Sequence, residues 1–135
     1  MPFKTTYESD FYKIEVDQEN DLLRAEWLRS VNREEMITGG TKLYESLRDY
    51  SITKAIANAQ RLEAFDTATK EWMSNNFYTL LSQTPLQKLA RILPESLFPK
   101  LTLEAVATRA DAQNINKFIY KNFLNEQEAL DWINE

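Results

Sequence analysis

The chain has 135 residues, of which 43% are hydrophobic and 27% charged, proportions typical of one globular domain and not of a disordered segment. Its formal net charge of −5 disfavours binding to nucleic acids, which select for basic surfaces. It contains neither histidine nor cysteine, which excludes disulfides, thiolate nucleophiles, the usual zinc sites and the histidine bases of most catalytic triads.

The start of the chain predicts neither a secretory signal nor a membrane anchor. Residues 1–9 are polar without a clear period, and they are expected to form a loose lead-in. Met1-Pro2-Phe3-Lys4 does not open an apolar signal core, and no apolar run approaches the ~20 residues that span a bilayer. Together with the lack of cysteine, this predicts a cytoplasmic protein without stable membrane insertion.

The next segments predict a β-hairpin. Apolar side chains alternate over 11–16 and again over 22–28, and the residues between them, 17–21, are of the kinds that form turns. An edge strand of this hairpin would be able to pair with a second copy of the chain. A homodimer is therefore one assembly that the sequence allows.

A helix is predicted to follow the hairpin. Asn32 with Glu35 three residues later forms a capping-box pattern, and apolar residues then recur at helical spacing as far as Tyr50. The two glycines of the chain, Gly39 and Gly40, fall inside this helix, where glycine costs about 1 kcal/mol relative to alanine. They predict either a close approach of the helix to the sheet or a kink, and both alternatives stay open.

Strands and helices alternate through the rest of the chain. Short apolar segments predict strands over 52–59, 86–93 and 115–123. Cap residues place helix starts at Asp66, Thr102 and Asn125. The order β-β-α-β-α-β-α-β-α predicts an α/β fold with a mixed, mostly parallel, five-stranded sheet and about four helices, in a single domain over 1–135.

Four local patterns resemble a known family. They are the helix with Tyr44 and Leu47 ahead of a short strand, Trp72 in the second helix, Ala90-Arg91-Ile92-Leu93-Pro94 ahead of Leu97-Phe98, and the ending Phe123, Glu126, Glu128, Ala129, Leu130, Trp132, Ile133. Together they resemble the SpoIIAA-like group of STAS domains, which are similar in turn to CRAL-TRIO lipid-transfer domains. The resemblance runs from Phe11 to Ile133 and implies a bacterial, non-enzymatic domain that regulates a partner or binds a ligand.

The resemblance also implies a phosphorylation switch, from which this chain departs. In anti-sigma factor antagonists of the group, a serine near the start of the helix after the third strand is phosphorylated, and Ala68 stands at the matching position here. Thr67 or Thr69 would replace it only if the register slips by one residue. Asn58 stands where the preceding strand of the group often ends in aspartate. We therefore expect this chain to lack the covalent switch.

One edge of the predicted sheet carries polar residues suited to recognition. Ligands of open α/β sheets bind beyond the carboxyl ends of parallel strands, where a helix N-terminus offers free N–H groups to an anion. The candidate binding residues are Asn58, Gln60, Arg61, Asp66, Thr67 and Thr69. Arg61 would add a bidentate contact to a carboxylate or phosphate. The competing interpretation is that Asp66 is only a helix cap and Arg61 a solvated loop residue.

No catalytic residue, metal ligand or cofactor site is predicted. Acidic pairs such as Glu34-Glu35 stand in first helical turns, where they complement the helix dipole. The acids of 17–21 have the spacing that begins an EF-hand loop, but Leu22 replaces the glycine which that loop requires. The glycine pair lies within a helix and forms no phosphate loop. Catalysis by carboxylates alone stays an open but disfavoured alternative.

Two kinds of function remain open. The first is a STAS-like regulatory module that recognises a protein partner or a small ligand through the 58–69 edge. The second is a carrier or sensor of an apolar, lipid-like molecule in a pocket between the aromatic helix faces and the sheet.

Overall fold

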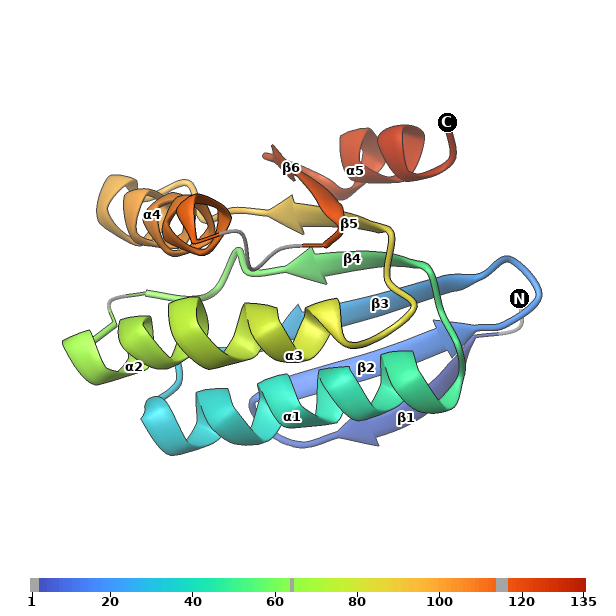
Figure 1. Ribbon diagram of the computed structural model, residues 1–135, viewed down its shortest axis with the longest axis horizontal. Coiled ribbons are helices and arrows are strands. Elements are labelled where there is room, and N and C mark those ends of the chain that lie inside the picture. Colours follow the sequence, from blue (N-terminus) through green and yellow to red (C-terminus); the bar gives the residue numbers. More distant parts are fainter. Residues whose placement is uncertain (1–2, 64, 114–116) are drawn as a thin grey trace.

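The centre of the architecture is one mixed β-sheet (Figure 1). The computed structural model describes residues 3–63, 65–113 and 117–135. Within them, six strands lie side by side in the order β1-β2-β3-β4-β5-β6. Their bounds are β1 Lys4–Glu8, β2 Tyr12–Asp17, β3 Leu22–Trp27, β4 Lys54–Asn58, β5 Lys88–Ile92 and β6 Ile119–Phe123. β1, β2 and β3 pair antiparallel and β3 to β6 pair parallel, so the carboxyl ends of β3 to β6 share one edge.

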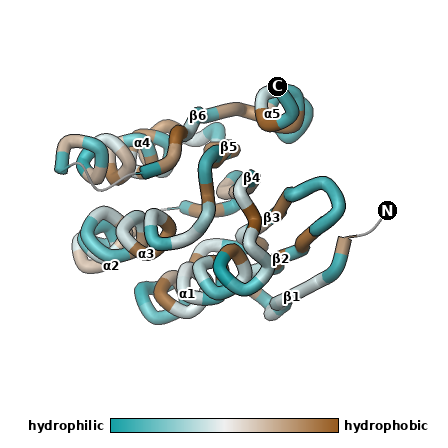
Figure 2. Tube along the Cα trace, turned by 45° about the vertical axis from the view of Figure 1, so that its right-hand side comes forward, coloured by the Kyte–Doolittle hydropathy of each residue, from teal (hydrophilic) through white to brown (hydrophobic). Residues whose placement is uncertain are grey.

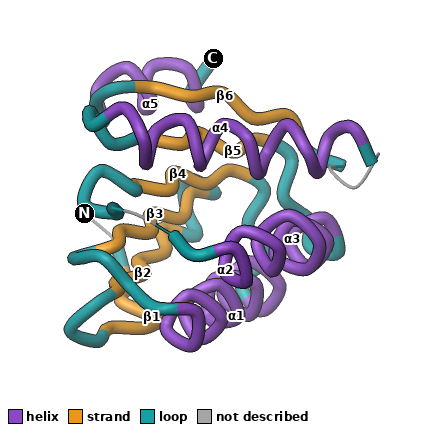
Figure 3. The backbone as a smooth tube through the Cα atoms, turned by 90° about the vertical axis from the view of Figure 1, so that its left-hand side faces the viewer, coloured by secondary structure: helices purple, strands orange, loops and turns teal. Residues whose placement is uncertain are grey.

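Helices cover the two faces of this sheet unequally (Figure 3). They are α1 Arg33–Asp49, α2 Thr67–Trp72, a π-helical turn η1 Met73–Phe77, α3 Tyr78–Ser82, α4 Leu97–Ala112 and α5 Glu126–Ile133. Because α2, η1 and α3 continue into one another, the described residues form four helical segments. The first three segments contribute to the larger hydrophobic core on one face, whereas α5 packs on the other face against β4 and β5.

The predicted fold class is confirmed except for the number of strands. The sequence predicts five strands and a loose lead-in over 1–9, but the structure has a sixth strand there, β1, paired with β2. Its residues are exposed or half-buried, so no apolar alternation marks this strand in the sequence. β1 also takes the edge position that the prediction gave to the hairpin, and both hairpin strands therefore have neighbours within the sheet.

The predicted hairpin is confirmed, and its acidic turn has a structural role. β2 and β3 pair from Tyr12 opposite Trp27 to Asp17 opposite Leu22, and Figure 2 colours the connecting turn as hydrophilic. The Asp21 carboxylate reaches the start of β4: Oδ1 accepts a hydrogen bond from the Thr53 N–H at 2.8 Å, and Oδ2 accepts one from the Thr53 hydroxyl. The turn thereby fixes the parallel strand beside it.

The two glycines mark close approaches on both sides of an uninterrupted α1. The capping box is present, because Asn32 Oδ1 accepts from the Glu35 N–H and the Glu35 carboxylate accepts from the Asn32 N–H. A Cβ atom on Gly39 would lie 2.5 Å from the ring of Trp27, and one on Gly40 would lie 2.7 Å from the ring of Trp72. Of the two alternatives, the structure has the close approach, toward the sheet at Gly39 and toward the neighbouring helix at Gly40.

Several element bounds differ from the predictions. α4 begins at Leu97 after Ser96, so Thr102 lies inside this helix rather than at its start. The proline in its first turn is compatible with a helix, because an N–H at that position has no intrahelical partner. β5 and β6 are shorter than predicted, and Ile115, the predicted start of the last strand, lies outside the described residues.

α5 covers only part of the second sheet face. Ala129 and Ile133 pack there against Ile56, Ala90 and Ile92. Beside them the outer sides of β2 and β3 carry charged residues such as Glu15 and Arg24, whose side chains form an ion pair at 3.3 Å. None of the helices in the described part of the chain is both long and apolar enough to cross a membrane.

Candidate functional site

The predicted site residues fall into two groups, one in and after β4 and the other at the start of α2. Asn58 ends β4, and its Oδ1 accepts a hydrogen bond from the Gln60 N–H at 3.0 Å. Gln60 Nε2 in turn donates to the Leu124 carbonyl at 3.1 Å, which ties the loop after β4 to the end of β6. Arg61 is exposed. The polar groups of Asn58 and Gln60 are thus used within the protein.

Asp66, Thr67 and Thr69 belong to the start of α2. Asp66 is the N-cap, and its Oδ1 accepts from the Thr69 N–H at 2.8 Å. Hydrogen bonds from Thr69 lower the pKa of the Asp66 carboxyl below its ordinary value. Thr69 is only 1% exposed, whereas Thr67 and Ala68 are exposed. The Asp66 carboxylate therefore accepts a hydrogen bond from one of the free N–H groups of this turn, and the helix start is capped by the chain itself.

A more coherent site lies between the sheet and the helices that cover it, near the carboxyl ends of β3, β4 and β5, and it is partly open to solvent. It is a cavity of about 40 Å³. Its lining is mostly apolar and comes from the sheet, α1, η1, α3, α4 and the loop after β4: Trp27, Met36, Ala57, Ala59, Leu62, Met73, Phe77, Tyr78, Arg91, Leu93 and Leu103. A volume above the ~10–15 Å³ that one water needs leaves room for a small chemical group.

The floor of this cavity exists because β4 presents alanines to the helices. Ala57 pairs with Ala25 on β3 and with Arg91 on β5, and Ala59 follows it two residues on, where alternation returns the chain to the same face. Alanine side chains end at Cβ, so they leave space under the helices that a valine or leucine would fill. The two alanines, Ala57 and Ala59, therefore create the space between β4 and the helices.

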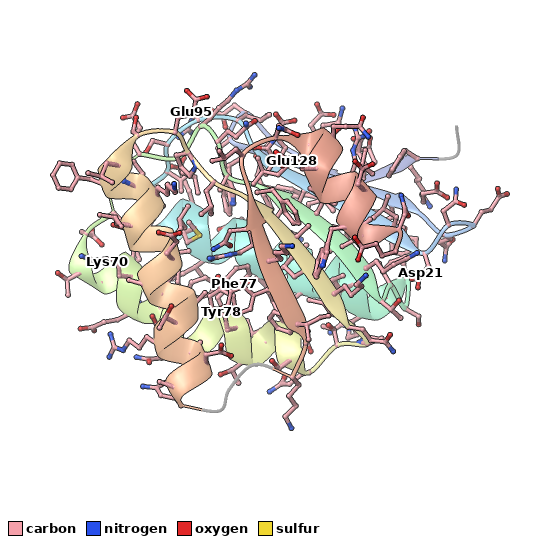
Figure 4. The ribbon with its side chains drawn as sticks, turned by 90° about the horizontal axis from the view of Figure 1, so that it is seen from above. Asp21, Lys70, Phe77, Tyr78, Glu95 and Glu128 are labelled. Atoms are coloured by element: carbon pink, nitrogen blue, oxygen red, sulfur yellow. The ribbon has the colours of Figure 1, made fainter. Side chains whose placement is uncertain are left out.

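The roof is adaptable. Met36 from α1 and Met73 from η1 face the cavity, and the unbranched methionine side chain can change shape at low energetic cost. Phe77, at the end of η1, completes the wall beside Tyr78, and Figure 4 labels both residues near the middle of the molecule, in a view from the side of α5 and β6. π-helical turns of this kind occur often at functional sites.

Arg91 is the charged residue at this site. It lies near the carboxyl end of β5, the strand beside the edge strand β6, and is only 5% exposed. Its Nε donates to Asn122 Oδ1 at 3.0 Å, and its Nη1 donates to the Tyr78 hydroxyl at 2.8 Å and to the Leu103 carbonyl at 2.9 Å. These bonds join β5 to β6, α3 and α4.

The charge of Arg91 is not neutralised by a neighbouring carboxylate. None of the ion pairs formed by the described residues includes Arg91, and its Nη2 is buried without a hydrogen-bond partner among them. An arginine stays protonated in proteins. Burying a charge without a counter-ion costs on the order of several kcal/mol, so this arrangement requires an explanation.

An aromatic ring also contacts Arg91. The guanidinium carbon lies 5.3 Å from the centre of the Tyr120 ring, a cation–π contact. Burial, followed by the Asp111 carboxylate, raises the pKa of the Tyr120 phenol, which keeps that group uncharged at neutral pH. The Tyr120 hydroxyl donates a hydrogen bond to Asp111 Oδ2 at 3.5 Å.

Sequence reasoning does not select Arg91 as a binding residue, although a signal for it is present. It is the one charged residue in the buried run Leu89 to Leu93, where every second side chain faces the helices. A cation in the centre of a buried strand is rare and is most often paired. That pattern distinguishes Arg91 from the exposed Arg61.

Comparisons with known proteins identify the fold. No family model matches the chain, and no curated protein matches it. Among solved structures, the chain is similar to an uncharacterised protein of the DUF3478 family with a SpoIIAA-like fold from Shewanella loihica PV-4. The sequences are 18% identical, the match covers 96% of this chain and 99% of the other, and the TM-score is 0.58. The predicted SpoIIAA-like fold is thereby confirmed.

Proposed function

We propose that the protein is a non-catalytic binding module that holds a small, largely apolar molecule in the cavity above β4. The observation that carries this proposal is the cavity itself, which is lined by aromatic and aliphatic side chains at the carboxyl ends of neighbouring parallel strands. Open α/β sheets bind their ligands at that end, and most small-molecule sites are apolar with few polar groups.

The shape of the cavity supports this function over recognition through the 58–69 edge. At the edge, Asn58, Gln60 and Asp66 already bond to other parts of the chain. In the cavity, the small side chains of Ala57 and Ala59 leave a volume unfilled. The flexible side chains of Met36 and Met73 can rearrange to enlarge that volume around a ligand. A core without function would gain stability by filling it.

Two measurements test the proposal. Native mass spectrometry of freshly purified protein is expected to show a copurifying small molecule that denaturation releases. Protein stripped of that molecule is then titrated with N-phenyl-1-naphthylamine, a neutral apolar dye whose fluorescence rises in a dry site. Saturable binding is expected in the wild-type protein.

The variant Ala57→Leu places a larger side chain in the cavity and should weaken dye binding at least tenfold. Ala68→Leu is the matched control, because Ala68 is exposed at the start of α2. Circular dichroism confirms that each variant is folded. Equal dye binding by wild type and folded Ala57→Leu would contradict the proposed site, and loss of binding in Ala68→Leu alone would return the site to the 58–69 edge.

A further inference from the structure

The cavity contains one charged group, and it is a cation. Among the described residues that line it, Arg91 is the only one with a side-chain charge. We infer that the ligand carries a carboxylate on an apolar body, and that Arg91 binds this carboxylate. The inference rests on the proposed function, because it names the chemical class of the molecule held in the same cavity.

The hydrogen-bond donors of Arg91 show what is left for a ligand. A guanidinium has five N–H groups. Nε uses one toward Asn122, and Nη1 uses two toward Tyr78 and Leu103. Both N–H groups of Nη2 remain, and this nitrogen is buried without a hydrogen-bond partner among the described residues. Three bonds thus hold the side chain in place, and Nη2, which the surrounding atoms cover, is the nitrogen left for a ligand that displaces them.

The partners of Arg91 leave its charge available as well. An amide oxygen, a phenol and a backbone carbonyl accept its hydrogen bonds, and all of them are neutral. An anion bound beside Arg91 would therefore form a buried ion pair in place of a lone buried cation. Because removing or supplying one partner of such a pair has a large energetic effect, an anionic ligand gains more here than a neutral one of equal size.

The dimensions favour a carboxylate over a phosphate. The space is about 40 Å³, and the rest of the lining is apolar apart from the Tyr78 hydroxyl and the Trp27 indole. A phosphate group brings more oxygens and up to two charges, and would need further donors that this lining does not provide. A singly charged carboxylate needs fewer donors, because one of its oxygens can accept a hydrogen bond from Nη2, and an apolar chain or ring attached to it matches the remaining wall.

A purely structural role for Arg91 makes a different prediction. In that case the side chain serves only to join β6, α3 and α4, and the cavity would bind charged and neutral molecules of the same size alike. The preference between two such molecules therefore separates the two roles.

The experiment compares hexanoate with hexan-1-ol, which have the same carbon chain and differ in the charged group. Binding to the stripped wild-type protein is followed in 1H–15N NMR spectra through the Arg91 Nε–H and the Trp27 indole N–H signals. We expect hexanoate to bind at least tenfold more tightly than hexanol. Arg91→Met should remove that preference while hexanol still binds, and Arg61→Met, at the exposed arginine, should retain it. Inorganic phosphate is titrated in parallel and should compete weakly or not at all.

Each outcome decides the inference. Equal binding of hexanoate and hexanol to the wild type would overturn it and leave the proposed function intact, whereas no binding of either ligand would overturn both. A carboxylate preference that persists in Arg91→Met would assign the recognition to another group and overturn the role of Arg91. Tight phosphate binding would overturn the choice of carboxylate. If Arg91→Met fails to fold, Arg91→Gln provides the comparison: it removes the charge but keeps a hydrogen-bond donor, and an unchanged preference in it would overturn the assignment.

Discussion

The Arg91 cavity and the 58–69 edge lie at the same end of the sheet, yet they differ in almost every physical respect. Arg91 is buried, donates three hydrogen bonds and has one nitrogen without a partner in the described part of the chain, whereas Arg61 is exposed. The general rule that ligands bind near the carboxyl ends of parallel strands applies to both regions. The comparison teaches that the rule indicates at which end of the sheet to look for a ligand. Burial and unpaired hydrogen-bond donors then distinguish the two regions at that end.

The reason lies in the alternation of side chains along β4 and β5. Asn58 and the loop after it turn toward the surface. There the Gln60 N–H donates to Asn58, and the Gln60 side chain donates to the Leu124 carbonyl after β6. Ala57, Ala59 and Arg91 face the helices instead and line the cavity, where Ala59 and Arg91 are buried and Ala57 is half-buried. An unpaired donor in water is solvated, but an unpaired donor in the interior is available only to a ligand.

The largest effect is expected from a change beside Trp27, which lines the cavity. In Gly39→Ala the new Cβ would meet Trp27, which stacks on the buried Tyr12 ring and has little freedom to move. We expect a loss of about 2–3 kcal/mol in the free energy of unfolding, despite the better helix propensity of alanine. Gly40→Ala is the control and should lose less, because the half-buried Trp72 can shift. Urea denaturation measures both, and an unchanged midpoint for Gly39→Ala would show that Trp27 yields.

Tyr78→Phe should have the next largest effect. It removes the hydroxyl that accepts from Arg91 Nη1 and leaves a second nitrogen of the same buried cation short of a partner. The expected loss of stability is about 1–2 kcal/mol. Tyr50→Phe serves as the control, because Tyr50 is a half-buried tyrosine that does not line the cavity. This variant should change stability by less than about 0.5 kcal/mol. Wild-type stability in Tyr78→Phe would mean that Arg91 rearranges to replace the lost hydrogen bond.

At the edge, Asp66→Ala should lower the thermal midpoint by only roughly 2–4 °C, through loss of the helix cap. The folded state lowers the pKa of Asp66, so its contribution is present above the ordinary pKa of the carboxyl and disappears as the pH falls through the folded value. The difference between wild type and variant is therefore expected at neutral pH and should shrink in acid. Asp66→Asn keeps a capping oxygen and should resemble the wild type at pH 7. A difference that grows in acid would contradict this assignment.

The smallest effect is expected from Arg61→Ala. The side chain is exposed, so stability should change by less than about 0.5 kcal/mol and binding of the neutral dye should not change. The double variant Arg61→Ala/Asp66→Ala extends the test to the whole edge. If this folded variant lost ligand or partner binding, the edge and not the cavity would be the functional region.

Much of the fold can be predicted from the sequence, because its signals are local. The turn at 17–21, the capping box at Asn32 and the caps at Asp66 and Asn125 act over a few residues, and each is present in the structure. β1 is missed because a polar edge strand carries no buried pattern, and the start of α4 is missed because Thr102 resembles a cap. Of the residues predicted for the site, Asn58 ends β4 and Asp66 caps α2, and the prediction did not include Arg91.

The sequence by itself determined the chemistry that is available: no histidine, no cysteine, an alternation of strands and helices, and one arginine in the run Leu89 to Leu93. Only the tertiary structure decided which of these features meet. Ala57 and Arg91 are 34 residues apart in the chain and become neighbours through the register of two parallel strands. Long-range pairing places them together, and whether a donor has a partner depends on every element packed around it, which no local pattern specifies.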